Sequence, residues 1–237
     1  MLLDVPQIQQ LRVVLASASP RRIELMRQIG LTPRVHVSGF AEDLDKSQFP
    51  SPAAYATETA RRKALDVATS TAAYDILVAA DSIVICPAGN VLEKPKNTAD
   101  AQQMLARLSG RRHAVSTGVA VVIAFNSGEV IRTDMPPGVA VEELSRDSEG
   151  RSRLCLTFSS TTAVTMGSLA PSLVDAYVSE PQNWSGKAGG YGIQDTAGAF
   201  VSGIEGDYYT VVGLPLHSLS ILLRAVMTSG LAWNGPA

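Results

Sequence analysis

The chain has 237 residues, of which 46% are hydrophobic, and this is enough to bury a core without disulfide or metal staples. Its formal net charge of −2, without a long run of lysines or arginines, argues against a protein that grips nucleic acid through the phosphate backbone. The first ten residues do not resemble a signal peptide, no apolar run reaches about 18 residues, and Cys86 and Cys155 are isolated, so we expect a cytoplasmic protein without a membrane segment.

The first predicted elements are a strand over residues 12–16 and a helix over residues 20–29. The strand is apolar and β-branched, Ser19 is a favourable N-cap, and the proline after it suits a first helical turn. Arg21 and Arg22 follow in that turn. A helix N-terminus is the positive end of the macrodipole, so each cation there costs about 0.3–1 kcal/mol unless an anion is bound nearby.

A phosphate group would remove this conflict at the helix start. Free backbone N–H groups, the hydroxyls of Ser17 and Ser19, and the guanidinium groups of Arg21 and Arg22 would converge on one anion. The alternative is that both arginines are simply solvated. The local pattern leaves the two interpretations open.

The next elements bring further charges. A short strand is expected over residues 33–38, followed by an acidic stretch that contains Glu42, and a helix from Ser51-Pro52 to about Ser70. Arg61, Arg62 and Lys63 are adjacent within that helix, so they point in different directions. Most of them are expected to face solvent, and at most two could reach a common site.

A carboxylate interrupts the apolar run that follows. Residues 76–80 predict a strand buried on both faces, Asp81 and Ser82 come directly after it, and the strand resumes over residues 83–86. A turn at Gly89-Asn90 then predicts a hairpin that returns Lys94 close to Asp81. An acid beside a lysine can be a structural ion pair or, in a cleft, equipment for phosphate chemistry.

The remaining elements follow from composition and periodicity. The sequence predicts a helix over 98–108 capped by Thr98, a strand over 112–125, a turn and strand over 126–133, an inserted surface loop over 134–152, a strand over 154–166, a helix over 171–179, strands over 200–204 and 208–212, and a helix over 216–226. The loop is rich in proline, glycine and charge without clear periodicity, and is a candidate mobile segment.

Four glycines and a lysine lie within residues 186–195, which also hold Gln194. This composition suits a backbone that approaches a ligand closely, although Lys187 is not in a Walker A spacing and a plain glycine-rich turn is the alternative.

The residues that depart from the structural pattern favour phosphate chemistry. They are Ser17, Ser19, Arg21, Arg22, Glu42, Lys63, Asp81, Lys94, Lys187 and Gln194. The set holds cations for a polyphosphate and carboxylates for a divalent metal, but no persuasive covalent catalyst, since the three histidines are isolated and no nucleophile elbow surrounds the serines. Metal-assisted attack of water on a phosphoryl group therefore fits better than an acyl-enzyme route.

Several segments together resemble the Maf family in that family's order. They are SASPRRIEL (17–25), ADSIV (80–84), KP (94–95), LSG (108–110), TGV (117–119), KAGGYGIQ (187–194), GDYY (206–209) and GLP (213–215). The resemblance covers nearly the whole chain. It implies a single α/β domain over residues 1–237 with a mixed, elongated sheet flanked by helices and two lobes around a central cleft, similar to inosine-triphosphate pyrophosphatases.

The resemblance also implies an activity. It implies hydrolysis of nucleoside triphosphates to the monophosphate and pyrophosphate with Mg²⁺, Mn²⁺ or Co²⁺, and it alone suggests a homodimer. Arg21, Ser82 and Gln194 resemble the branch that acts on dTTP and UTP, and a glutamine amide can both donate to and accept from a uracil or thymine edge. Glu93 and Asp195 depart from the family pattern, which has glycine at both positions.

We therefore expect the following roles. Arg21, Arg22, Lys63 and Lys94 would hold the triphosphate; Asp81 and Glu42 would bind the metal, and Asp81 would orient or deprotonate the attacking water. Ser17, Ser19, Ser82, Lys187 and Gln194 would contact the substrate. The alternative function is a non-catalytic nucleotide-binding regulatory protein linked to cell division.

Overall fold

The computed structural model describes residues 2, 5–71, 73–126 and 135–233. These residues form one mixed sheet of eight strands in the order β2-β1-β3-β5-β7-β6, with β4 beside β3 and β8 beside β7. The strands are β1 (Val13–Leu15), β2 (Arg34–Val35), β3 (Ile76–Ile85), β4 (Val91–Leu92), β5 (Arg112–Phe125), β6 (Ala140–Leu144), β7 (Ser152–Met166) and β8 (Val201–Glu205). The helices are α1 (Pro20–Gln28), α2 (Pro52–Ser70), α3 (Thr98–Leu108), α4 (Pro171–Val178), α5 (Pro181–Trp184), α6 (Tyr208–Val212) and α7 (Leu216–Thr228).

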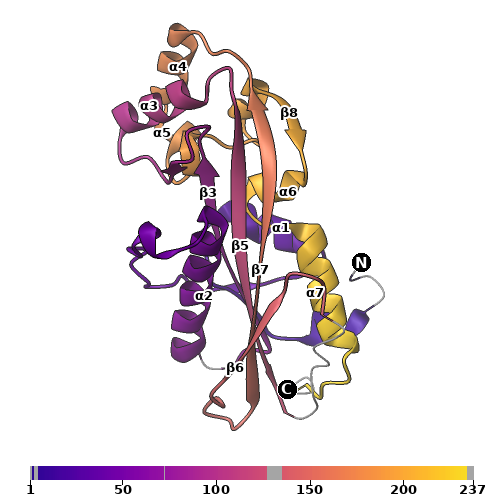
Figure 1. Cartoon of the computed structure of the whole chain (residues 1–237). Helices are drawn as coiled ribbons and strands as arrows, with labels where there is room; N and C mark the ends of the chain where they lie inside the picture. The colour runs from indigo at the N-terminus through magenta and orange to yellow at the C-terminus, as the bar shows by residue number, and fades with distance from the viewer. Residues whose placement is uncertain (1, 3–4, 72, 127–134, 234–237) are drawn as a thin grey trace.

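Three long strands, β3, β5 and β7, run along the length of an elongated molecule (Figure 1). At one end, here called the lower lobe, they are joined by β1, β2 and β6 and covered by α2 and α7; at the other, the upper lobe, they are joined by β4 and β8 and covered by α3, α4 and α5. The first strands, β1, β2 and β3, are parallel, and the remaining pairs are antiparallel. The predicted mixed α/β fold with two lobes is confirmed.

The buried apolar side chains fall into clusters that match the lobes. One large cluster joins β1, β3, β5 and β7 to α1 and α7, and a second packs α2 on the other face of the same strands. The upper lobe has its own cluster, which joins α3 and α4 to the far ends of the long strands. Between these clusters the strands carry polar residues, and there Asp81 lies in the middle of β3.

A glycine opposite Asp81 allows α2 to lie directly on the sheet. Gly118 of β5 is the register partner of Asp81. A Cβ atom at Gly118 would lie 2.4 Å from the carbonyl carbon of Ala56 and from the backbone nitrogen of Thr57, so no other residue allows this approach. Lys63 follows about two turns further along α2, and its Nζ reaches Asp81.

Two sequence predictions are wrong in their secondary structure. Residues 208–212 form helix α6 rather than a strand, because the Asp207 side chain accepts hydrogen bonds from the backbone N–H groups of Tyr209 and Thr210 and caps the helix. The described part of the 134–152 segment is not an irregular loop, because β6 pairs with β7 and lies at the edge of the sheet.

Smaller differences concern element ends. The cap of α3 is Asn97, whose side chain accepts from Asp100 N, and not Thr98. The strand expected over 33–38 is limited to β2, and the strand predicted within 129–133 lies outside the described residues. α2 begins and ends where the sequence predicts, with the Ser51 side chain accepting from Ala54 N.

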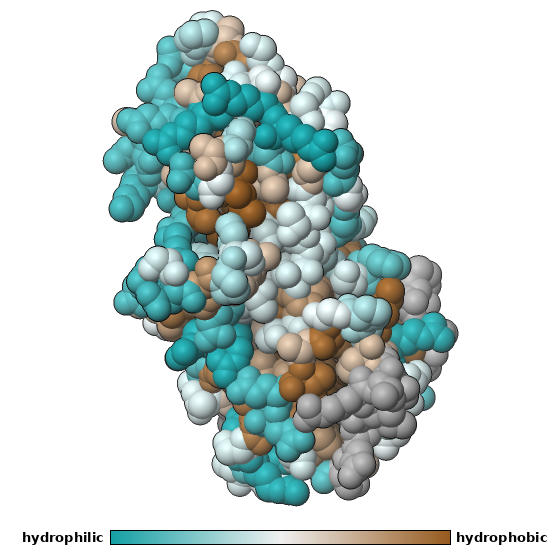
Figure 2. Space-filling model, in the orientation of Figure 1, coloured by the Kyte–Doolittle hydropathy of each residue, from teal (hydrophilic) through white to brown (hydrophobic). Residues whose placement is uncertain are grey.

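The surface and the cysteines complete the description. On the face seen in Figure 2, polar side chains predominate and apolar residues gather in small separate patches. Among the described residues, no helix has the length and apolar character needed to cross a membrane. Cys86 and Cys155 are both free and buried, as predicted.

Candidate functional site

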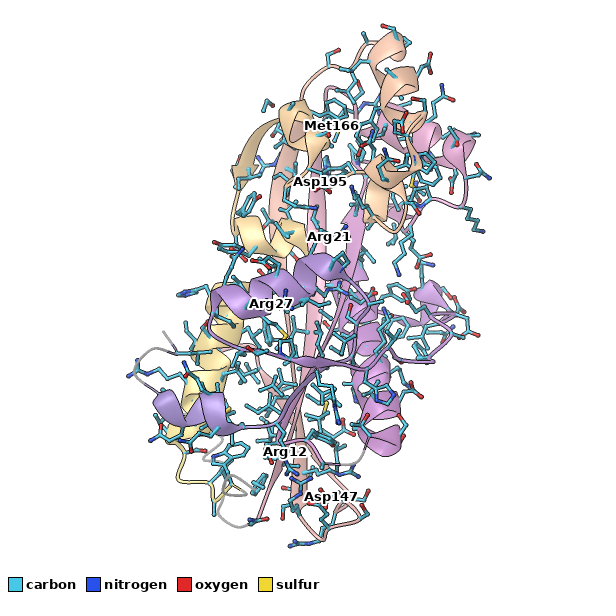
Figure 3. The ribbon with its side chains drawn as sticks, turned by 180° about the vertical axis from the view of Figure 1, so that it is seen from behind. Arg12, Arg21, Arg27, Asp147, Met166 and Asp195 are labelled. Atoms are coloured by element: carbon cyan, nitrogen blue, oxygen red, sulfur yellow. The ribbon has the colours of Figure 1, made fainter. Side chains whose placement is uncertain are left out.

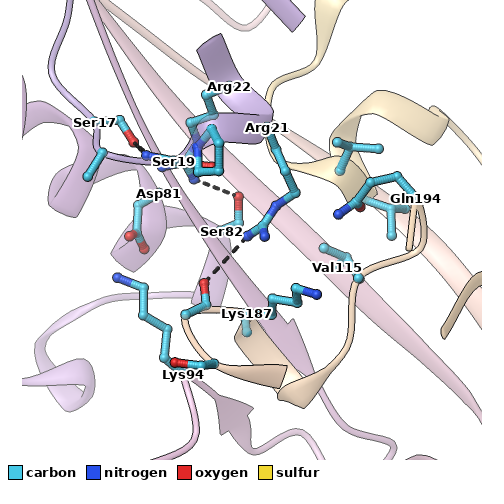
Figure 4. A pocket seen from close by; sticks show the side chains of 18 of the residues that line it. Ser17, Ser19, Arg21, Arg22, Asp81, Ser82, Lys94, Val115, Lys187 and Gln194 are labelled. Carbon is cyan, nitrogen blue, oxygen red and sulfur yellow. Dashed lines mark hydrogen bonds between the residues drawn. The ribbon is translucent and has the colours of Figure 1, made fainter. Parts of the chain in front are cut away.

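A cavity of about 600 Å³ lies between the two lobes, and the predicted site residues converge on it. Figure 4 shows this cavity from close by, with Asp81 and Lys94 on one side and Gln194 on the other. It is lined by Ala16, Ser17, Ser19, Arg21, Arg22, Glu42, Lys63, Asp81, Ser82, Val84, Lys94, Val115, Lys187 and Gln194, among others. All eleven site residues predicted from the sequence therefore border one cavity.

Lys63 joins the two predicted carboxylates. Its Nζ lies 2.7 Å from Asp81 Oδ1 and 2.9 Å from Glu42 Oε2, and the Lys63 and Asp81 side chains are each only 9% exposed. Lys94 approaches Glu42 from the solvent side, with its Nζ 3.4 Å from Oε1. Burial alone would raise the pKa of Glu42, but Lys63 and Lys94 together hold the pKa of that carboxyl below its ordinary value.

The neighbouring cations of α2 serve other contacts. Arg61 donates to both carboxylate oxygens of Glu142 in β6 and pairs with Glu58, and Arg62 also pairs with Glu58. Of the three adjacent cations on this helix, Lys63 therefore reaches the cavity, in agreement with the prediction that most of them would not.

Arg22 is held by protein groups. Its Nε donates to the carbonyl of Gly213 at 2.8 Å, its Nη1 to Ser17 Oγ at 3.1 Å, and its Nη2 to Ser82 Oγ at 3.0 Å. Ser82 also hydrogen-bonds to Thr117, at 2.8 Å. Arg22 thus fixes the two serines that border the cavity, and it lines the cavity itself.

Arg21 points into the cavity instead. It starts from α1, which crosses the middle of the molecule between the lobes (Figure 3), and its contact to the Gly186 carbonyl is long, at 3.4 Å. Burial lowers the pKa of Arg21, and nearby Asp195 opposes that shift. Burial likewise lowers the pKa of Arg22, with Asp81 opposing it. An anion in the cavity would stabilise both charged groups.

The start of α1 is open toward the cavity. Ser19 occupies the N-cap position, but its side chain makes no capping hydrogen bond, and its own N–H is directed to Ser17 Oγ at 3.2 Å. Ser19 is therefore the positional cap that the sequence predicts without the expected hydroxyl contact. A helix start in this state can receive an anion on its backbone N–H groups.

The Lys187 ammonium group makes its contacts within its own loop. Its Nζ donates to the carbonyls of Gln182 and Asn183, at 3.0 and 2.8 Å, and pairs with Asp195 Oδ2 at 2.6 Å. The side chain is only 7% exposed. Lys187 borders the cavity as predicted, but these three contacts use all the hydrogens of its ammonium group.

The two departures from the family pattern lie in different places. The Glu93 carboxylate accepts from Tyr55 Oη at 2.7 Å and pairs with Lys46 at 3.0 Å, and Glu93 is not among the residues that line the cavity. Asp195 does line it. Asp195 was not among the predicted site residues, although a signal was available in the sequence: a carboxylate directly beside Gln194 in a glycine-rich loop.

The apolar part of the cavity comes from the long strands. Val84 of β3 and Val115 of β5 are register partners and both line it. In Figure 4 Val115 lies on the side of Gln194 and away from Asp81. The cavity thus has a charged end and an end that combines an amide with apolar side chains.

The donor set for a divalent cation consists of Asp81 and Glu42. Among the described residues, no group of three or more histidine, cysteine, aspartate or glutamate side chains could hold a metal ion. Mg²⁺ commonly binds through one or two carboxylates together with substrate phosphates and water. Two carboxylates that both face a cavity lined by cations fit that mode, and they do not fit a metal held by protein alone.

Comparison with known proteins agrees with this chemistry. Residues 12–226 match the family described as Maf-like protein. The chain is 42% identical over 213 residues to a probable bifunctional dTTP/UTP pyrophosphatase/methyltransferase protein of Homo sapiens, covering 87% of this chain but 30% of that protein. It is 39% identical to a dTTP/UTP pyrophosphatase of Moorella thermoacetica and 36% identical to one of Vibrio cholerae, covering 90% of this chain in both cases and 93% and 97% of those proteins.

Proposed function

The chain belongs to the Maf-like protein family, and from this premise we propose that it is a nucleoside triphosphate pyrophosphatase that hydrolyses dTTP and UTP. The products would be the nucleoside monophosphate and pyrophosphate. The observation that carries the proposal is the Asp81–Lys63–Glu42 cluster, in which Asp81 and Lys63 are buried, at the charged end of a cavity between the lobes. The bacterial relatives, which this chain matches over nearly their full length, are named dTTP/UTP pyrophosphatases.

We assign different roles in this reaction to the residues that line the cavity. Arg21, Lys63 and Lys94 would offset the charge of the triphosphate, and Arg22 would act by fixing Ser17 and Ser82. Asp81 would orient or deprotonate the water that attacks the α-phosphorus. Positioning and charge stabilisation make up most of what phosphoryl transfer requires from a protein.

A divalent cation is part of this proposal. Asp81 and Glu42 would hold Mg²⁺, or Mn²⁺ or Co²⁺ in its place, together with phosphate oxygens of the substrate. When bound, the ion would supply further positive charge at the phosphate groups. Lys63 lies between the same two carboxylates, and its single positive charge offsets one of their two negative charges in the protein alone.

The proposal is tested with purified protein, a panel of nucleoside triphosphates and Mg²⁺, by following pyrophosphate release. Asp81→Asn should lower kcat by about 10²–10⁴, the range typical of general acid–base groups. Asp175→Asn is the matched control, because Asp175 is an exposed residue of α4 that contacts Gln102 outside the cavity. Pyrophosphate release by Asp81→Asn at the rate of the unchanged protein would refute the central role of Asp81.

Metal affinity separates the two roles of Asp81. If it binds the cation, Asp81→Asn should weaken Mn²⁺ binding; if it acts only on water, binding should be retained. Tight nucleotide binding without any hydrolysis would instead favour the regulatory alternative, which the names of the reported relatives do not support.

Two further proposals concern the cellular location and the oligomeric state of the enzyme. The free, buried thiols support a cytoplasmic location, where cysteines remain reduced. A homodimer is proposed from the family resemblance, and it is checked by measuring the mass of the protein in solution.

A further inference from the structure

The amide of Gln194 has a fixed partner at the apolar end of the cavity. Its Nε2 donates to Asp195 Oδ2 at 2.8 Å. An ionised carboxylate only accepts hydrogen bonds, so the nitrogen of the amide must be the atom that faces Asp195. The Gln194 carbonyl oxygen Oε1 then lies on the other side of the amide, where it can accept a hydrogen bond from a ligand.

The Asp195 carboxylate, which orients the Gln194 amide, also pairs with Lys187. Lys187 pairs with the same oxygen, Asp195 Oδ2, at 2.6 Å, and is anchored to the carbonyls of Gln182 and Asn183. Lys187 therefore balances the charge of Asp195, so that this carboxylate adds little repulsion toward a bound triphosphate.

The side chains of Gln194, Asp195 and Lys187 all lie close to Gly192. A Cβ atom at Gly192 would lie 2.8 Å from Asp195 Oδ2, 2.9 Å from Gln194 Nε2 and 3.2 Å from Lys187 Cδ. All three groups thus pack directly against a glycine. Any larger residue at position 192 would consequently displace the pair of Gln194 and Asp195.

We propose that Asp195, which stands where the family pattern has glycine, is a positioning residue that makes Gln194 a hydrogen-bond acceptor and so strengthens the selection of uracil and thymine over cytosine. Uracil and thymine carry an N–H at ring position 3, whereas cytosine has a lone pair there. An acceptor facing that lone pair would leave two desolvated acceptors in contact, which is unfavourable. This inference rests on the proposed function.

The arrangement of the cavity supports this placement of the base. Gln194 lies across the cavity from Asp81 and Lys94 (Figure 4), so a nucleotide whose phosphates lie among the charged groups would bring its base toward Gln194. Val84 and Val115 line the cavity as apolar groups against which a pyrimidine ring can pack.

The first test compares kcat/KM for UTP and CTP. Asp195→Ala frees the Gln194 amide to turn, so the UTP:CTP ratio should fall roughly tenfold, mainly through a gain for CTP. Asp195→Asn keeps a carbonyl oxygen that can accept from Gln194 Nε2, and should retain most of the ratio. An unchanged ratio in Asp195→Ala would overturn the inference.

A double-variant comparison shows whether Asp195 acts through Gln194. In a Gln194→Ala background, Asp195→Ala should change the ratio no further, because the group that it orients is missing. A tenfold fall in that background as well would assign the effect to Asp195 itself and refute the positioning role.

A substrate-side test needs no variant. UTP methylated at N3 lacks the N–H and should lose at least tenfold in kcat/KM, whereas UTP methylated at C5 carries the same added volume on another edge and should not. Equal hydrolysis of the two methylated nucleotides would refute the inference. If UTP itself releases no pyrophosphate, the proposed function fails and not this inference alone.

Discussion

The contact between Gly118 and α2 can be tested by adding one methyl group. In Gly118→Ala the new Cβ would lie 2.4 Å from the backbone of Ala56 and Thr57, whereas ordinary contact begins near 3.4 Å, so α2 must move away from the sheet by about 1 Å. Overpacking of this kind costs about 1–3 kcal/mol of unfolding free energy. The same shift moves Lys63 relative to Asp81, and a displacement of about 1 Å in a catalytic site can cost on the order of 10²-fold in rate.

Urea unfolding and pyrophosphate release measure the two effects separately. Gly203→Ala is the matched control, because Gly203 also lies in a strand, β8, but a Cβ there would have no atom within 4 Å. We expect Gly118→Ala to lose stability and kcat while Gly203→Ala keeps both. If the two variants unfold within about 0.5 kcal/mol of each other, the reasoning about the close approach of α2 is refuted.

Three further predictions follow from charged and titratable groups. Lys94→Ala should raise the pKa of Glu42, observed by NMR titration, because one of the two cations that lower it is removed. Burial lowers the pKa of His113 to about 4, below its ordinary value of 6.5. Between these pH values the unfolded chain binds a proton that the folded protein does not, so the free energy of unfolding should fall as the pH decreases. His113→Gln should flatten this part of the curve of unfolding free energy against pH, measured with urea. Asp75→Ala should cost about 3–5 kcal/mol in urea unfolding, because it removes an acceptor of the buried Arg151.

Matched variants define the outcomes that contradict these predictions. Lys96→Ala removes a nearby exposed lysine and should leave Glu42 unchanged, so an equal effect of both lysine variants would exclude a specific contact of Lys94. Parallel pH profiles for the unchanged protein and His113→Gln would exclude His113 as their source. Asp175→Ala removes an exposed carboxylate, and a similar loss of stability in both aspartate variants would show that burial of Asp75 is not the cause.

The sequence predicted the elements and site residues whose signals are local. The start of α2 follows from its serine cap, and Asp81 was recognisable as a carboxylate in an apolar strand. α6 was mistaken for a strand because its residues have high strand propensity, while the capping by Asp207 that decides the structure involves one side chain.

Contacts between distant segments were not predictable in this way. β6 is a strand because β7 provides its hydrogen-bond partners, and nothing in residues 140–144 indicates that pairing. Lys187 forms an ion pair with Asp195 and hydrogen bonds with two carbonyls because its loop folds back on itself. Composition identified Lys187 as a cation near a ligand site but could not show that its hydrogen bonds are already used.

The unbroken course of β3 through both lobes has a consequence for substrate length. Asp81, at the charged end of the cavity, and Val84, at the apolar end, are three residues apart on this strand, which corresponds to about 10 Å of extended chain. β3 is continuous between them, so in the proposed binding mode one strand would hold the groups that meet the reacting phosphate and the base at a constant separation. A nucleotide with a longer or shorter connection between its base and its reacting phosphate would then fit only one of the two ends of the cavity.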